Sequence, residues 1–306
     1  MKAARKAFTA ELLELAKKDS RIFAVATDSR GSVTLGDFVK ELPNQFVECG
    51  IAEQDAIGIS AGLSSLGLIP FVCGPASFYS MRSAEQVKVD VAYSHSNVKV
   101  IGVSGGVSYG ALGGTHHAIQ DIALFRAVPD MTVIIPADGP QAAAMTRELV
   151  KFNGPVYVRM GRGDVPEVYD EEPAFEIGKA NFLAEGKDAA VIACGEMVFP
   201  AVEAAKQLAS EGIHVTVIDM HTIKPLDTEA VIKAAATGAI VTIEEHIIRG
   251  GLGGAVAETV CQECPCKMKI LGLPDETVYS GTNKEVFEHY HLNAAGIIAA
   301  VKELIG

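Results

Sequence analysis

The sequence predicts an α/β protein with two domains, each a mostly parallel sheet with helices on both faces. Its 306 residues exceed the roughly 150 of a single average domain. Hydrophobic residues make up 49% and charged residues 21%, which is an ordinary globular composition. Short runs rich in β-branched residues alternate along the chain with longer helical patterns, and this alternation is typical of parallel sheets.

The first domain is predicted over 1–165. Its apolar positions repeat either at helical spacing or in short continuous runs. We expect helices over 4–18, 52–66, 77–93, 118–128 and 141–152, and strands over 21–27, 68–73, 98–104, 131–136 and 155–160.

The rhythm breaks over 161–188, where acidic residues, prolines and glycines gather, and we expect an exposed connection with a linker over 166–188. The second, smaller domain is predicted over 189–306. It is expected to hold strands over 189–194, 214–220, 239–245 and 267–273, helices over 198–211 and after Gly253, and two C-terminal helices.

The balance of charge argues against two classes of partner. The formal net charge is −12, whereas surfaces that bind nucleic acid or anionic membranes need basic patches. The sequence has no uninterrupted apolar run of 18 residues, and its start lacks the apolar core of a signal peptide. We therefore expect a cytoplasmic protein, in which a few local arginines can still bind an anionic small substrate.

The six cysteines are too few for a disulfide scaffold at this length. Cys49, Cys73 and Cys194 lie in apolar, strand-like segments and are predicted to be buried thiols. The C-x-x-C-x-C spacing of Cys261, Cys264 and Cys266 has no fourth ligand nearby, so it favours a surface turn over a metal site.

The segment 50–63, GIAEQDAIGISAGL, places Glu53 at the start of a helix built almost wholly of small and apolar residues. An acidic residue in a first helical turn can simply complement the helix dipole. A helix this apolar is expected to be packed on both sides, however, which would bury the carboxylate and make it a candidate functional group.

A glycine-rich loop over 104–117 follows a predicted strand and ends in His116 and His117. Ligands of open α/β sheets bind beyond the carboxyl ends of strands, and glycines let backbone approach a ligand closely. Residues 102–106 also fit G-x-S-x-G, the pattern around a hydrolase nucleophile, with Ser104 as the serine. Because five glycines follow instead of a helix, a serine hydrolase is the weaker interpretation.

Two other patterns say less about function. The glycines at 250–254 lack the third glycine of a dinucleotide-binding fingerprint, so they predict close helix packing. Arg30, Arg82, Arg159 and Arg162 follow strands or lie on an apolar helix, so each is a candidate anion anchor. Taken singly, each better fits a solvated charge or a structural ion pair.

Taken together, GIAEQDAIGISAGLS, the T-H-H at 115–117, GPVYVRMGR, IKPLD and EEHIIRGGLGGAVAE resemble the transketolase family. The likeness covers the whole chain, but it corresponds only to the pyrimidine-binding and C-terminal domains. It therefore resembles the second subunit of a transketolase that is split into two polypeptides. More weakly, it resembles 1-deoxyxylulose-5-phosphate synthases and the β subunits of 2-oxo-acid dehydrogenases.

The resemblance implies thiamine diphosphate as cofactor and a role for each matching residue. Glu53 matches the glutamate that hydrogen-bonds the aminopyrimidine ring, and either Phe78 or Tyr79 matches the aromatic residue that stacks on it. His116 matches a histidine that faces the thiazolium and substrate hydroxyls, and Asp28 an aspartate at the cofactor and substrate mouth. Arg5, Ser32 and Arg159 match residues that hold a sugar phosphate.

Two departures shape the expected function. The family's G-D-G motif, which with a later Asn holds the diphosphate and Mg²⁺ (or Ca²⁺), is missing from this sequence. The resemblance thus implies a partner subunit carrying G-D-G…N, in a heterotetramer with two copies of each chain. Leu112 stands where the family has an aspartate that reads a substrate hydroxyl, and Ser104 where it has a phosphate-contacting histidine. We therefore expect a two-carbon ketol transfer from a modified ketose, such as a sulfonated or branched sugar phosphate. A non-catalytic scaffold is the alternative of another class.

Overall fold

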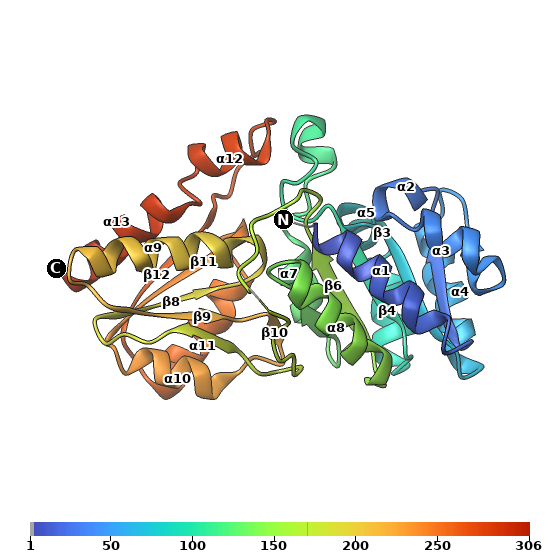
Figure 1. Cartoon of the computed structure of the whole chain (residues 1–306), viewed down its shortest axis with the longest axis horizontal. Coiled ribbons are helices and arrows are strands. Elements are labelled where there is room, and N and C mark those ends of the chain that lie inside the picture. Colours follow the sequence, from blue (N-terminus) through green and yellow to red (C-terminus); the bar gives the residue numbers. More distant parts are fainter. Residues whose placement is uncertain (1–2, 170) are drawn as a thin grey trace.

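The computed structural model describes residues 3–169 and 171–306, which form two α/β units side by side (Figure 1). The first unit contains a seven-stranded sheet and the second a five-stranded sheet. In order across the first sheet, the strands are β10 (Thr222–Lys224), β5 (Thr132–Ile134), β6 (Val156–Met160), β4 (Lys99–Val103), β3 (Ile69–Pro75), β1 (Ile22–Ala26) and β2 (Phe46–Glu48). Across the second they are β12 (Lys267–Leu273), β11 (Ala239–Ile247), β8 (Ala189–Ala193), β9 (Val215–Asp219) and β7 (Asn181–Ala184).

Apart from β10 and β7, which pair antiparallel, the strand pairs of both sheets are parallel, so the predicted fold class is confirmed. Alternate side chains of a strand enter cores on opposite faces. In β3, Phe71 and Cys73 pack on one face with helix residues such as Phe8 and Leu12, while Val72 packs on the other with Ile57. Such burial on both faces explains why the strands read as continuous apolar runs.

Helices cover both faces of each sheet. On the first sheet, α1 (Ala4–Ala16) and α8 (Gly139–Lys151) supply one core, and α4 (Glu53–Ser65) and α7 (Asp121–Ala127) supply the other. On the second, α9 (Val198–Ser210) and α13 (Ala294–Ile305) lie opposite α10 (Thr228–Ala235) and α11 (Leu252–Glu263). The shorter helices are α2 (Arg30–Val33), α3 (Gly36–Glu41), α5 (Ala76–Arg82), α6 (Ala84–Gln86) and α12 (Asn283–His289).

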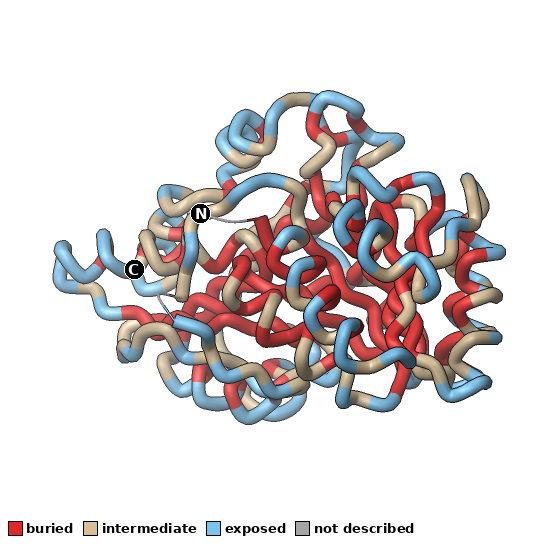
Figure 2. The backbone as a smooth tube through the Cα atoms, turned by 45° about the vertical axis from the view of Figure 1, so that its right-hand side comes forward, coloured by how far each residue is buried: buried red, intermediate tan, exposed pale blue. Residues whose placement is uncertain are grey.

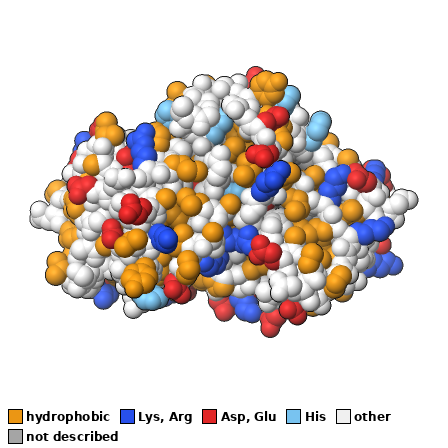
Figure 3. Space-filling view, turned by 180° about the vertical axis from the view of Figure 1, so that it is seen from behind, with side chains coloured by type: hydrophobic (Ala, Val, Ile, Leu, Met, Phe, Trp, Pro, Cys, Tyr) orange, Lys and Arg blue, Asp and Glu red, His pale blue; other side chains and the backbone are white. Residues whose placement is uncertain are grey.

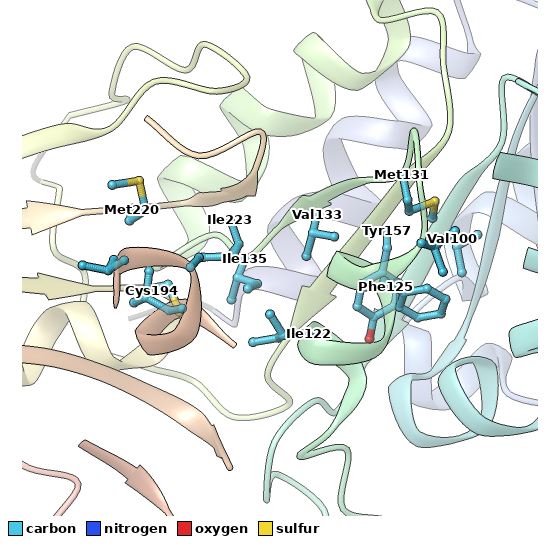
Figure 4. Packing of buried hydrophobic residues seen from close by; sticks show 14 of the residues in the cluster. Val100, Ile122, Phe125, Met131, Val133, Ile135, Tyr157, Cys194, Met220 and Ile223 are labelled. Atoms are coloured by element: carbon cyan, nitrogen blue, oxygen red, sulfur yellow. The ribbon is translucent and has the colours of Figure 1, made fainter. Parts of the chain in front are cut away.

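The two units share one hydrophobic core. Ile122 and Ile135 of the first unit belong to the same buried cluster as Cys194, Met220 and Ile223 (Figure 4). Strand β10, which follows β9 along the chain, leaves the second unit and pairs with β5 of the first sheet. Figure 2 shows buried backbone running through the middle of the molecule. Side chains placed where the units meet are thus held by both.

Several expectations at the level of single elements were wrong. The helix predicted over 77–93 is interrupted at Ser83, which leaves helical geometry while its hydroxyl donates to the Tyr79 carbonyl; a π-helix, η2 (Val87–Tyr93), follows α6. Strand β7 lies inside the predicted linker, and the short strands β2 and β10 were not foreseen. Cys73 and Cys194 are buried as predicted, but Cys49 is only half-buried.

Two surface observations concern the excluded partners. Within the described residues, no helix is both long and apolar enough to cross a membrane. On the face drawn in Figure 3, acidic and basic side chains are interspersed with apolar ones.

Candidate active site

The candidate residues gather at one edge of the first sheet. Because β1, β2, β3, β4 and β6 are parallel, their carboxyl ends all meet at this edge. The segments that leave these ends carry, in chain order, Asp28 and Ser32, Glu53, Phe78, His116 and Arg162. Open parallel sheets bind ligands at such an edge.

Glu53 is the first residue of α4 and is only 5% exposed. Its Oε1 accepts a hydrogen bond of 3.1 Å from Nη1 of Arg82, at the end of α5. The guanidinium carbon of Arg82 lies 3.8 Å from the centroid of the Phe78 ring. The buried carboxylate is thus held in one orientation, beside an aromatic ring.

The structure separates the two neighbouring aromatic candidates. Tyr79 is completely buried, its hydroxyl lies 3.3 Å from Oγ1 of Thr27, and burial raises its pKa above the ordinary range. Phe78 is half-buried, and its ring centroid lies 5.3 Å from that of His116. Phe78 therefore stands beside the other candidates, whereas Tyr79 belongs to the core.

His116 leaves the glycine-rich loop just after the 3₁₀ segment η3 (Gly110–Thr115). Its ring centroid also lies 5.3 Å from that of Tyr109, in an edge-to-face arrangement, and its Nδ1 lies 2.9 Å from Oγ1 of Thr115. Two aromatic rings and a hydroxyl thus fix the imidazole, which remains half-exposed.

Two arginines meet on the other side of Tyr109. Nε of Arg5 donates to the Arg162 carbonyl over 2.9 Å, and another nitrogen of Arg5 donates to the Ser32 carbonyl. Oγ of Ser32 lies 3.0 Å from the Tyr109 hydroxyl, and the guanidinium carbon of Arg162 lies 4.7 Å from the Tyr109 ring centroid. Burial and the nearby Arg162 charge lower the pKa of Arg5. Two cations held this close favour an anion between them.

A cavity of about 1050 Å³ adjoins this arginine pair. Arg5 and Arg162 line it together with Ser108 and apolar side chains of α9 and α12. Nη1 of Arg162 and Oγ of Ser108 are buried and have no hydrogen-bond partner within residues 3–169 and 171–306. Unpaired buried polar atoms are costly, so both are candidates to hydrogen-bond a polar ligand in this cavity.

Asp28 lies at the rim of the edge and is exposed. Its φ of +51° places it in the left-handed region, and its N–H donates to Oε1 of Glu48 over 2.7 Å. Oε2 of Glu48 also pairs with Arg30 at 3.3 Å. These contacts leave the Asp28 side chain at the mouth of the site.

Arg159 lies elsewhere and is 3% exposed. Its Nη2 donates to the carbonyl and to Oε2 of Glu245 over 2.6 and 3.0 Å, and its Nη1 lies 3.7 Å from Oδ1 of Asp121. Burial by itself would lower its pKa, but Asp121 and Glu245 together raise it above the ordinary value. The guanidinium is therefore occupied by carboxylates of the protein.

Ser104 is fully buried with a φ of +57°, and its Oγ has no hydrogen-bond partner in the described part of the chain. Turns and η3 follow it instead of the helix that a nucleophile elbow requires. His117 is also buried, and burial lowers its pKa. Leu112 is 54% exposed on η3.

In the described part of the chain, no three or more candidate metal ligands come together. Cys261 is exposed and Cys264 and Cys266 are half-buried. The glycines at 250–254 pack closely, as predicted: a Cβ at Gly253 would meet Ile270 and Thr242.

The geometry thus adds three residues to the site. Arg82 and Arg162 were only general anion-binding candidates in the sequence, and Tyr109 was missed. Tyr109 stands among the glycines of the loop, where an isolated large ring is the one signal that could have drawn attention to it.

Comparison with known proteins gives a consistent answer across the chain. Residues 1–167 match the family description "Transketolase, pyrimidine binding domain", and residues 178–297 match "Transketolase, C-terminal domain". The chain is 55% identical to one of the subunits of the apulose-4-phosphate transketolase of Phocaeicola vulgatus, over 100% of this chain and 98% of that protein.

Two further relatives are similar over nearly their whole length. A 6-deoxy-6-sulfo-D-fructose transketolase subunit of a Clostridium species is 38% identical, over 96% of this chain and 91% of its own. A solved structure described as a split gene transketolase, inactive beta4 tetramer, superposes with a TM-score of 0.93 at 38% identity, over 100% of this chain and 99% of that one.

Proposed function

This chain belongs to the transketolase family, and we propose that it is the C-terminal subunit of a split transketolase that uses thiamine diphosphate. The observation that carries the proposal is the buried carboxylate of Glu53, held by Arg82 beside Phe78 and His116 at the carboxyl edge of the sheet. The reaction would move a two-carbon ketol unit from a ketose to an aldose.

The residues at this edge fit one end of the cofactor. A carboxylate can accept a hydrogen bond from a ring nitrogen of an aminopyrimidine, and a half-buried aromatic ring can stack on that ring. Glu53 and Phe78 supply this pair, so we assign the stacking role to Phe78 and a core role to Tyr79. When bound, thiamine diphosphate supplies a nucleophilic carbon and an electron sink for cleaving the bond next to a carbonyl.

Glu53 and His116 would carry the proton chemistry of this chain. Glu53 would hold a hydrogen bond to the pyrimidine ring, with Arg82 keeping the carboxylate in place. Thr115 engages Nδ1 of His116, which leaves Nε2 to orient a substrate hydroxyl or move its proton. Asp28 would stand at the shared mouth of the cofactor and substrate sites.

We assign the anionic tail of the substrate to Arg5, Arg162, Ser32 and Tyr109. Nε of Arg5 donates to the backbone carbonyl of Arg162, and Arg162 keeps a buried donor that has no partner in the described residues. Arg159 is left out of this set, since Glu245 and Asp121 already occupy its guanidinium.

The substrate we propose is a branched or sulfonated ketose carrying an anionic tail, with apulose 4-phosphate as the first donor to test. The relatives at 55% and 38% identity are named for apulose 4-phosphate and for a sulfonated fructose. Leu112 favours a ketose donor that differs from the usual sugar phosphates, because an apolar side chain cannot hydrogen-bond a substrate hydroxyl as a carboxylate would.

The partner we propose is an N-terminal transketolase subunit with the G-D-G…N motif, which would hold the diphosphate and Mg²⁺ (or Ca²⁺). A heterotetramer with two copies of each chain would place the active sites between subunits. The β tetramer of a related split transketolase is called inactive, in line with the need for a second subunit. The free thiols Cys73 and Cys194 favour the cytoplasm as its compartment.

The test is reconstitution with an N-terminal transketolase subunit that carries the G-D-G…N motif. The pair should consume apulose 4-phosphate with an aldose acceptor only when thiamine diphosphate and Mg²⁺ are present, and this chain alone should be inactive. Release of CO₂ from pyruvate would instead indicate a decarboxylating synthase or dehydrogenase. Failure of the pair to bind the cofactor would favour a scaffold, and labelling of Ser104 by a fluorophosphonate would favour a hydrolase.

A further inference from the structure

The end of β11 lies against the glycine-rich loop of the other unit. Oε1 of Glu245 accepts a hydrogen bond of 2.7 Å from the N–H of Val107, near the start of the loop. Oε2 of the same carboxylate pairs with Arg159 at 3.0 Å. Both side chains are almost completely buried, so this ionic contact lies inside the boundary between the two units.

The next two residues of β11 hold the other arm of the loop. Nε2 of His246 accepts from the N–H of Ala123 over 3.2 Å, and the N–H of Ile247 donates to the carbonyl of Ile119 over 3.0 Å. Ile119 and Ala123, which make these contacts with β11, follow His116 closely along the chain. Three consecutive residues of the second unit therefore anchor the segments on both sides of Tyr109 and His116.

The tip of the loop also rests on the second unit. A Cβ at Gly110 would collide with the Gly281 carbonyl, and one at Gly106 would collide with Glu245 and Arg159. Figure 1 shows the tip of this loop beside the segment that leads into α12. The loop thus fits closely against the second unit at base and tip, and its conformation is fixed from outside its own sheet.

We propose that Glu245, together with Arg159, is a positioning residue: through it the C-terminal domain sets the placement of Tyr109 and His116 toward the substrate. The contact of the loop with substrate rests on the proposed function. Glu245 and Arg159 do not line the cavity beside the arginine pair, so they would act through Val107 and the loop backbone. The C-terminal domain would then influence substrate binding through the conformation of the loop.

Glu244 provides a matched control within the same strand. It is also buried, but its carboxylate caps α11, where it accepts hydrogen bonds of 2.7 and 2.8 Å from the N–H groups of Leu252 and Gly253. E244Q and E245Q are therefore the same chemical change at adjacent buried positions. The first weakens a helix end within the C-terminal domain, and the second weakens the hold on the loop.

Amide hydrogen exchange on the full-length chain without partner tests the contact itself. E245Q should accelerate exchange across 105–118 by about tenfold or more, while E244Q should accelerate it across 252–256 instead. The reconstituted pair then tests the consequence: E245Q should raise KM for the phosphorylated donor about tenfold with a smaller change in kcat. E245D, which keeps the charge but shortens the reach to Val107, should act in the same direction if E245Q does not fold.

Unchanged exchange across 105–118 in E245Q, or in E245D where only that variant folds, would overturn the proposal whatever the pair's activity. Kinetics in which E245Q or E245D loses kcat and keeps the wild-type KM, as expected from a reduced folded fraction, would also overturn it. Failure of the proposed function looks different, because the wild-type pair would then be inactive while the exchange pattern of the variants persists.

Discussion

The carboxyl ends of the two sheets have the same architecture, but their polar residues differ in exposure and in hydrogen bonding. At the first sheet, Phe78, His116 and Arg162 are half-exposed, and donors of Arg162 and Ser108 lack partners within the described residues. At the second sheet, Asp219, Glu244, Glu245 and His246 are all buried and hydrogen-bonded inside the chain. Asp219, Glu245 and His246 of the second edge pair with residues outside the C-terminal domain, and Glu244 pairs with the backbone of its own domain.

This difference shows that fold alone does not decide where a site lies. Polar residues follow the strands of both sheets, as the doubly wound architecture allows. Such residues can bind a ligand only where they are not already hydrogen-bonded or ion-paired with the protein's own backbone and side chains. The predictions below therefore separate residues that await a ligand from residues that are already paired.

The largest effect is expected at Glu53. E53Q keeps the size of the side chain and an oxygen for Arg82, but it removes the carboxylate that would act on the cofactor. Turnover of the reconstituted pair should fall by roughly 10²–10⁴-fold, measured as donor consumption at saturation. Assembly, measured by size-exclusion chromatography, should not change. E85Q, an exposed acid on α6, is the control, and near-normal turnover of E53Q would remove Glu53 from its role.

The next largest effect is on folding, at Arg159. R159M leaves the buried carboxylates of Glu245 and Asp121 without their cation, which costs roughly 3–5 kcal/mol. Urea unfolding of this subunit measures the loss. R147M removes a partly exposed arginine that pairs with Glu11 and Glu172, and should cost about 1 kcal/mol or less. Equal losses in the two variants would contradict the assignment of Arg159 to a buried network.

A substitution of Arg162 should weaken substrate binding and leave the folding stability of the subunit nearly unchanged. R162M removes a charged donor from the arginine pair, and charged hydrogen bonds contribute roughly 1.5–3 kcal/mol. KM for a phosphorylated donor should therefore rise about 10–100-fold, with kcat and the unfolding free energy little changed. An unphosphorylated analogue of the same ketose is the control, since its KM should not respond. Equal changes for both substrates would place the phosphate elsewhere.

These two arginines also mark the limit of what the sequence predicts. They lie three positions apart and both follow the same apolar run, so sequence spacing cannot tell them apart. The environment of Arg159 depends on its hydrogen bond to Glu245, which lies in the other unit, 86 residues further along the chain. The role proposed for Phe78 rather than Tyr79 likewise rests on burial, which depends on how α5 packs onto the sheet.

What the sequence could predict rests on local regularity. Strands buried on both faces read as apolar runs, and Glu53 stood out because its helix is otherwise small and apolar. Strand β10 was missed because it pairs with a strand of the other unit. The helix break at Ser83 was also missed. The family resemblance supplied most site residues, but their contacts required the structure.

A pH-dependent effect is expected at Asp219, on the covered edge. Burial raises the pKa of this carboxyl to about 7, while Tyr169 and Gln141 each donate to it over 2.6 Å. Between about pH 4 and 7 the unfolded chain has released this proton and the folded chain retains it, so stability falls as pH rises, by at most about 1.4 kcal/mol per pH unit.

D219N cannot ionise, and its amide would occupy the place of Oδ1, which has no partner among the described residues. Its unfolding free energy relative to the wild type should therefore rise from pH 5 to pH 7 and level off above it, measured by urea titration at each pH. D275N, an exposed aspartate of the same unit, should show no such trend. A difference for D219N that is constant with pH would mean that Tyr169 and Gln141 hold Asp219 as a carboxylate throughout, so that even the covered edge keeps its charge by pairing rather than by protonation.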